Sequence, residues 1–83
     1  MMEEIKDKVR GFLVDNFLFG TANGIEDDTS FLEAGILDST GVMEVVAFLE
    51  QQFGIQVDDD ELTPENLDSI SSIGAFVSRK LQA

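Results

Sequence analysis

Apolar side chains recur at helical spacing in three long segments of the chain, and this pattern most limits the folds available to it. Such a stripe is typical of an amphipathic helix, so we expect helices over residues 3–18 and 39–53 and a last helix from about residue 69. A shorter helix is expected at residues 63–67, where Thr63 and Pro64 suit a helix start. The sequence therefore predicts an all-α fold: a small four-helix bundle with a long first loop and a short third helix. The first two stripes consist of Ile5, Val9, Phe12, Leu13 and Phe17, and of Val42, Val45, Val46, Leu49 and Phe53.

The long connection at residues 19–37 carries helix-breaking residues at its start, among them Gly20 and Gly24. A short turn is expected at residues 30–34, capped by Asp28 or Thr29. A loop this long in a small domain is usually functional or anchored to the core.

With 83 residues and 43% apolar content, the chain is long enough for one modest core, and we expect a single domain over residues 1–83. It has no cysteine, so neither a disulfide nor a thiolate metal site is available. No apolar run reaches the length of a signal peptide or a membrane span. We therefore expect a cytoplasmic monomer that does not associate with membranes.

The formal net charge is −12, and all five basic residues lie near the two ends of the sequence. Fourteen carboxylates and no base fall between residues 11 and 78. Such a surface repels nucleic acid and anionic lipid, because binding to either requires neutralised phosphates. It favours proteins with basic patches, which it attracts by long-range electrostatic steering. An acidic run at residues 58–61 lacks the ligand spacing of a calcium loop, so no metal site is expected.

The composition also argues against catalysis by the chain itself. A serine nucleophile needs a base, usually histidine, and the chain has no histidine. No pattern places two carboxylates in one buried cleft. We therefore do not expect an enzyme.

One junction combines a turn with a helix start: Gly35 is followed by two large apolar residues and then by Asp38, Ser39 and Thr40. All three polar residues are favoured as helix N-caps, because their side-chain oxygens accept from unpaired backbone N–H groups. The junction is expected to fix the backbone of Ser39 and to expose its hydroxyl group. In a simpler interpretation, Ser39 is only the cap of the helix.

Residues 29–39, which end in Asp38-Ser39, resemble the phosphopantetheine attachment motif of acyl carrier proteins. The resemblance implies that Ser39 carries 4′-phosphopantetheine, transferred from coenzyme A, and that Asp38 is the family's preceding aspartate. Thr40 and Gly41 depart from the motif, in which leucine or methionine usually follows the serine.

In that family, partner enzymes bind the helix that follows the serine. By position, the resemblance assigns docking to Thr40, Met43, Glu44, Ala47 and Glu50. A cargo pocket between this helix and its neighbours is expected to involve Val46, Leu49, Phe53 and Leu62.

The resemblance thus implies a carrier that tethers a thioester-linked acyl or aminoacyl intermediate and presents it to enzymes of fatty acid, polyketide or specialised metabolism. Its expected partners are a phosphopantetheinyl transferase and loading ligases or synthases with basic patches. The alternative from another class is an unmodified acidic helical module that binds a basic protein.

Overall fold

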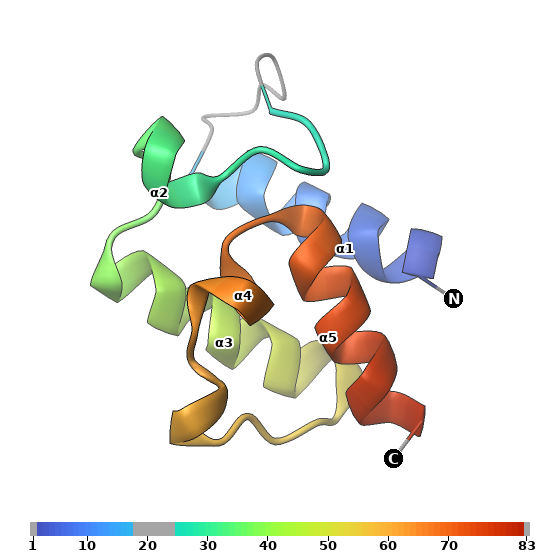
Figure 1. Ribbon diagram of the computed structural model, residues 1–83. Helices are drawn as coiled ribbons and strands as arrows, with labels where there is room; N and C mark the ends of the chain where they lie inside the picture. Colours follow the sequence, from blue (N-terminus) through green and yellow to red (C-terminus); the bar gives the residue numbers. More distant parts are fainter. Residues whose placement is uncertain (1, 18–24, 83) are drawn as a thin grey trace.

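A computed structural model describes residues 2–17 and 25–82 of the chain. Within these ranges all regular structure is helical, and there is no strand, as the sequence predicts. The elements in chain order are α1 (Met2–Asn16), α2 (Phe31–Ala34), α3 (Ser39–Phe53), the 3₁₀ turn η1 (Asp59–Glu61), α4 (Pro64–Leu67) and α5 (Ile70–Gln82), arranged as in Figure 1.

The helix boundaries agree with the sequence prediction at most positions. Helix α3 spans the predicted residues, and the C-cap residue Gly54 ends it in the left-handed region with φ 67°. Helix α1 ends at Asn16, while the predicted stop at Gly20 lies outside the described residues. The short turn in the first connection is the single-turn helix α2, whose cap is Ser30 rather than the predicted Asp28 or Thr29. Helix α5 begins at Ile70, and the hydroxyl of the preceding Ser69 accepts from the backbone N–H of Ser72 at 3.0 Å.

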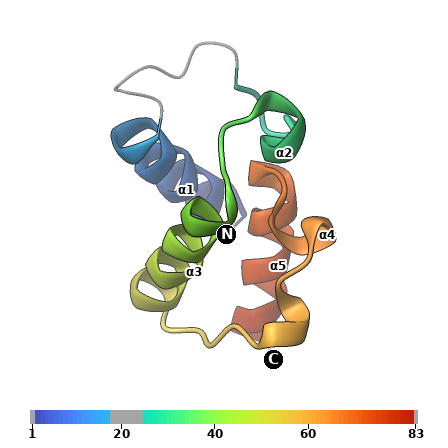
Figure 2. The same ribbon diagram turned by 90° about the vertical axis from the view of Figure 1, so that its left-hand side faces the viewer.

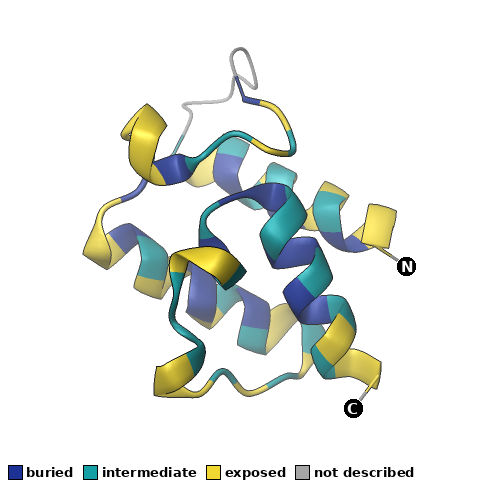
Figure 3. Ribbon diagram, in the orientation of Figure 1, coloured by how far each residue is buried: buried dark blue, intermediate teal, exposed yellow. Residues whose placement is uncertain are grey.

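Helix α5 is the central packing element, since it packs against α1, α3 and α4 (Figures 1 and 2). Buried positions lie on the faces that these helices turn toward one another, as the dark blue segments of Figure 3 show. The largest side chains with almost no exposed surface are Phe31, Phe76, Leu13, Leu49, Ile70 and Ile73. Burial of apolar surface is therefore the main source of stability in this small fold.

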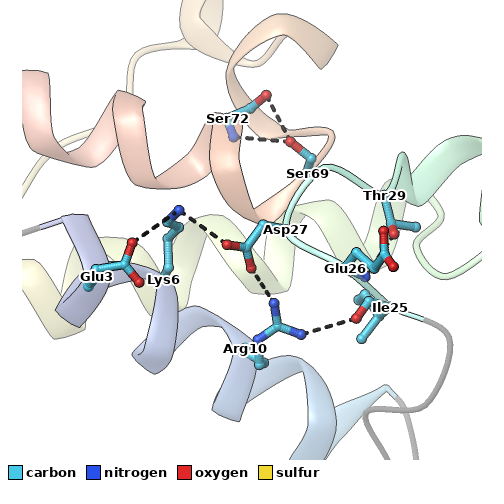
Figure 4. Close-up of polar contacts among 9 residues, drawn as sticks. All are labelled: Glu3, Lys6, Arg10, Ile25, Glu26, Asp27, Thr29, Ser69 and Ser72. Carbon is cyan, nitrogen blue, oxygen red and sulfur yellow. Dashed lines mark hydrogen bonds and ion pairs between the residues drawn. The ribbon is translucent and has the colours of Figure 1, made fainter.

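Asp27 anchors the long first connection to α1, as Figure 4 shows, and also to α5. Its carboxylate accepts from Lys6 Nζ at 3.1 Å and from the Arg10 guanidinium, both on α1. Arg10 also donates to the carbonyl oxygen of Ile25 at 3.2 Å, and the Ser71 backbone N–H on α5 donates to the Asp27 carbonyl oxygen at 2.8 Å. The Lys6 hydrogen bond, reinforced by Arg10, holds the pKa of Asp27 below its ordinary value of 3.8. The loop that leads to α2 is thus held by specific charged contacts.

A second ion pair fastens the acidic run to α5. Lys80 Nζ donates to Glu61 Oε1 at 2.9 Å, and the Asp58 backbone N–H donates to the same carboxylate. The Asp58 hydrogen bond, followed by the Lys80 ammonium, lowers the pKa of Glu61. The ion pair and this hydrogen bond therefore hold the segment against α5. No group of acidic side chains in the described residues has the arrangement of a metal site.

No helix in the described part of the chain is long and apolar enough to cross a membrane.

Candidate functional site

Asp38 is the N-cap of α3, so Ser39 does not cap the helix. The Asp38 backbone is extended, with φ −106° and ψ −171°, and its Oδ1 accepts from the Gly41 backbone N–H at 2.8 Å. Ser39 is the first residue of the helix and is exposed. Within the described ranges, no residue forms a hydrogen bond with the Ser39 hydroxyl. The interpretation of Ser39 as the helix cap is therefore wrong, and its hydroxyl is available to solvent.

The segment before the cap is fixed by a turn and an apolar anchor. Gly35 ends α2 in the left-handed region, with φ 69°, and Leu37 is buried in the core. Gly41, one of the two residues that depart from the motif, lies where the first turn of α3 approaches other side chains. A β-carbon at Gly41 would lie 3.1 Å from Leu37 Cδ2 and 3.2 Å from Phe17 Cε1. Glycine thus allows the first turn of α3 to pack closely, which fixes the position of Ser39.

A groove of about 310 Å³ opens beside Ser39, between α2, the first turns of α3, and α4. Its lining is mainly apolar and includes Leu32, Met43 and Leu67. Leu32 and Met43 are 60% and 53% exposed, unusually high values for large apolar side chains in this protein. An apolar groove beside an exposed hydroxyl can shelter an apolar group that is attached through that hydroxyl.

Asp68, at the junction of α4 and α5, is the single charged residue among the described residues that line this groove. Its carboxylate accepts from the Ser30 hydroxyl and, at 3.0 Å, from the Leu32 backbone N–H. Its own carbonyl oxygen accepts from the Phe31 backbone N–H at 2.8 Å. These contacts tie α2 to the α4–α5 junction and hold the carboxylate in the groove wall.

The predicted docking residues fall into two groups. Thr40, Met43, Glu44 and Ala47 are exposed on the same helix as Ser39, as a docking face requires. Glu50 is only half-exposed, and its carboxylate accepts from the Val57 backbone N–H at 2.9 Å. Glu50 therefore also holds the segment that follows α3.

The predicted cargo residues do not all line the groove. Leu62 does, whereas Val46 and Leu49 are 6% and 0% exposed and belong to the core. Phe53 is half-buried and makes an edge-to-face contact with Phe48, at a centroid distance of 6.3 Å. Sequence reasoning missed Leu32 and Asp68 as groove residues; the only local signal was the position of Leu32 in the attachment motif.

Comparisons with known proteins found a matching family model and similar chains. Residues 18–77 match the family model described as "Phosphopantetheine attachment site". The chain is 28% identical over 75 residues to "Probable acyl carrier protein PigG" of Serratia sp., covering 90% of this chain and 86% of that protein. It is 32% identical over 76 residues to an "Acyl carrier protein" of Lactobacillus acidophilus, covering 92% of this chain and 88% of that protein. A chain in a crystal structure of an FAD-dependent dehydrogenase has a similar fold, with a TM-score of 0.74 and 29% identity over 83% of this chain and 97% of that chain.

Proposed function

The chain belongs to the acyl carrier protein family, whose members carry covalent 4′-phosphopantetheine, and we propose that this chain carries the group on Ser39. The observation that supports this most directly is the exposed Ser39 hydroxyl without a hydrogen-bond partner in the described structure. The start of α3 also suits a phosphodiester, since helix N-termini present free N–H groups and a partial positive charge.

The attachment step needs only the hydroxyl from this chain. The Ser39 oxygen would attack the phosphorus atom that bears the pantetheine arm in coenzyme A and form a new P–O bond. The phosphoanhydride bond would break, the nucleotide would leave with both of its own phosphate groups, and the serine proton would pass to a base of the transferase. The base and the activating metal belong to the transferase, which agrees with the absence of histidine from this chain. When bound, the arm supplies a thiol that holds the cargo as a thioester.

The exposed face of α3 is the proposed docking surface for the transferase and for the enzymes that load and use the cargo. Met43 and Ala47 provide a small apolar strip, and Glu44 provides negative charge beside it. No basic residue occurs between residues 11 and 78, so the face suits partners with basic patches. Glu50 contributes negative charge from the edge of this surface while it holds Val57.

The proposed role is that of a carrier, without catalysis of its own, in a biosynthetic pathway that builds acyl or aminoacyl thioesters. The Thr40-Gly41 pair and the neutral Gln51-Gln52 pair favour a specialised pathway over housekeeping fatty acid synthesis. The similar chain in the structure of an FAD-dependent dehydrogenase adds such a dehydrogenase to the candidate partners. We further propose that the chain acts as a single-domain monomer in the cytoplasm.

The groove beside Ser39 is the proposed site for the part of the cargo that folds back onto the protein. Leu62 would contact it directly. Val46, Leu49 and Phe53 would be reached only if α3 and α4 separate and open the core.

The test is incubation with coenzyme A and a permissive phosphopantetheinyl transferase, followed by mass spectrometry of the intact protein. We expect one phosphopantetheine adduct on the wild type and none on Ser39→Ala. A folded wild type that gains no adduct with several transferases would favour the unmodified acidic module. An adduct that persists in Ser39→Ala would place the arm elsewhere.

A further inference from the structure

The groove beside Ser39 carries one negative charge, that of Asp68, and the fold fixes the position of this charge. Asp68 is half-buried, and its two carboxylate oxygens accept from Ser30 and from the Leu32 backbone N–H. Both partners are neutral, so the negative charge is held in place without being neutralised. A carboxylate has about four acceptor positions, so these two bonds leave others for a ligand.

No basic side chain of the described residues offsets this charge within the groove lining. Lys6 and Arg10 pair with Asp27, and Lys80 pairs with Glu61. A charged group that enters the groove therefore meets Asp68 and a mainly apolar lining.

From this arrangement we propose that the groove selects cargo by the sign of its charge: it shelters neutral or amine-bearing acyl groups and excludes acyl groups that end in a carboxylate. The inference rests on the proposed attachment of the arm at Ser39. An anionic cargo would lose hydration among Leu32, Met43 and Leu67 and would face a fixed carboxylate. An ammonium group loses hydration as well, but it gains a charge-assisted hydrogen bond to Asp68.

The selection has a consequence for the cargo class. Dicarboxylic half-thioesters would stay in solvent, open to any partner and to hydrolysis. Aminoacyl and simple aliphatic thioesters would spend part of the time in the groove, where water is scarcer. The groove would therefore protect monocarboxylic or amino acid cargo better than dicarboxylic cargo.

The experiment uses the full-length protein loaded at Ser39 with three stable amide-linked pantetheine analogues. Their acyl groups are similar in length: 4-methylpentanoyl is neutral, 4-aminobutyryl is cationic and succinyl is anionic. Occupancy is read from the NMR shifts of the Leu32 and Leu67 methyl groups, relative to the protein with an unloaded arm. We expect clear shifts with the first two cargoes and a succinyl occupancy lower by about tenfold or more.

Two comparisons separate the effect of Asp68 from a general exclusion of charged groups by the apolar lining. In the wild type, 4-aminobutyryl and succinyl are both charged, so a preference for the cation shows that the sign matters. In Asp68→Asn, which keeps acceptor and donor groups for Ser30 and Leu32, succinyl occupancy should rise and the advantage of 4-aminobutyryl should disappear. Ser30→Ala is the matched control, because it removes one tether of Asp68 and keeps the charge, so the selectivity should persist.

Equal shifts for succinyl and 4-aminobutyryl in the wild type would overturn the inference, as would unchanged selectivity in a folded Asp68→Asn variant. Mass spectrometry of each sample separates this failure from failure of the proposed function. Absence of any adduct would overturn both proposals, whereas adducts without charge-dependent shifts would overturn only this one.

Discussion

Because Asp38 caps α3 and Ser39 does not, we expect alanine substitutions at these adjacent positions to differ in their effect on stability. Asp38→Ala removes the side chain that accepts from the Gly41 N–H at 2.8 Å, so it should destabilise the protein. Ser39→Ala removes an exposed hydroxyl without a partner in the described structure, so it should leave stability nearly unchanged. The same Ser39→Ala variant should lose modification completely.

The magnitude follows from the capping hydrogen bond. Loss of an N-cap side chain costs about 0.5–2 kcal/mol, typically about 1 kcal/mol. For a domain of this size, 1 kcal/mol corresponds to a fall in Tm of about 4–8 °C. At the first helical turn of α3, Ser39→Ala replaces a weaker helix former by a stronger one, so its effect should stay within about 0.5 kcal/mol.

The control is Asp38→Asn, which removes the charge but keeps a good capping side chain. The protein is strongly acidic, so loss of one negative charge can itself stabilise the fold; the difference between Asp38→Ala and Asp38→Asn isolates the cap. The assay is thermal and urea unfolding followed by circular dichroism, on protein without the arm. If Ser39→Ala lowered stability as much as Asp38→Ala, the serine would be the cap, and its hydroxyl would not be available as the structure indicates.

Three further predictions concern docking, the loop anchor and the core. Glu44→Lys, or a rise in salt above physiological strength, should slow transferase loading several-fold, measured as the initial rate of adduct formation; rates indifferent to both would remove the electrostatic argument. Asp27→Asn should destabilise the fold at pH 7. Because the pKa of Asp27 is lowered in the folded state, the difference in unfolding free energy between variant and wild type, measured with urea, should shrink as the pH falls below about 3.8. A difference that stays constant to pH 3 would contradict this. Leu49→Ala should cost about 2–5 kcal/mol in urea unfolding, because Leu49 has no exposed surface, whereas a cost below 1 kcal/mol would show that α3 is loosely packed.

Periodicity was enough to predict the three long helices, because α1, α3 and α5 each have one face on a shared core. Val9, Leu49 and Ile73 are all buried as a helical stripe requires. The same signal could not divide core from groove. Val42, Val46 and Leu49 all lie on the predicted stripe, yet Val42 lines the groove while Val46 and Leu49 are buried in the core, and periodicity does not separate them.

The polar contacts that define the site were harder to predict, because their partners are distant in sequence. Ser30 and Asp68 are separated by 38 positions, and no local propensity indicates that they meet. The N-cap of α3 was hard to predict for a different reason: Asp38, Ser39 and Thr40 are adjacent and all three are good caps. In the structure Leu37 is buried in the core and the next residue, Asp38, is the cap.

No basic residue of the described chain lines the groove beside Ser39. Lys6 and Arg10 are bound to Asp27, and Lys80 to Glu61, so these bases hold the long loop and the segment after α3 in place. The paired bases lie on α1 and near the end of α5, whereas α3 carries no base. The placement of the bases therefore affects both docking and the fold. A base next to Ser39 would weaken the attraction to basic partners. Removal of a base from α1 would loosen the loop that leads to the groove.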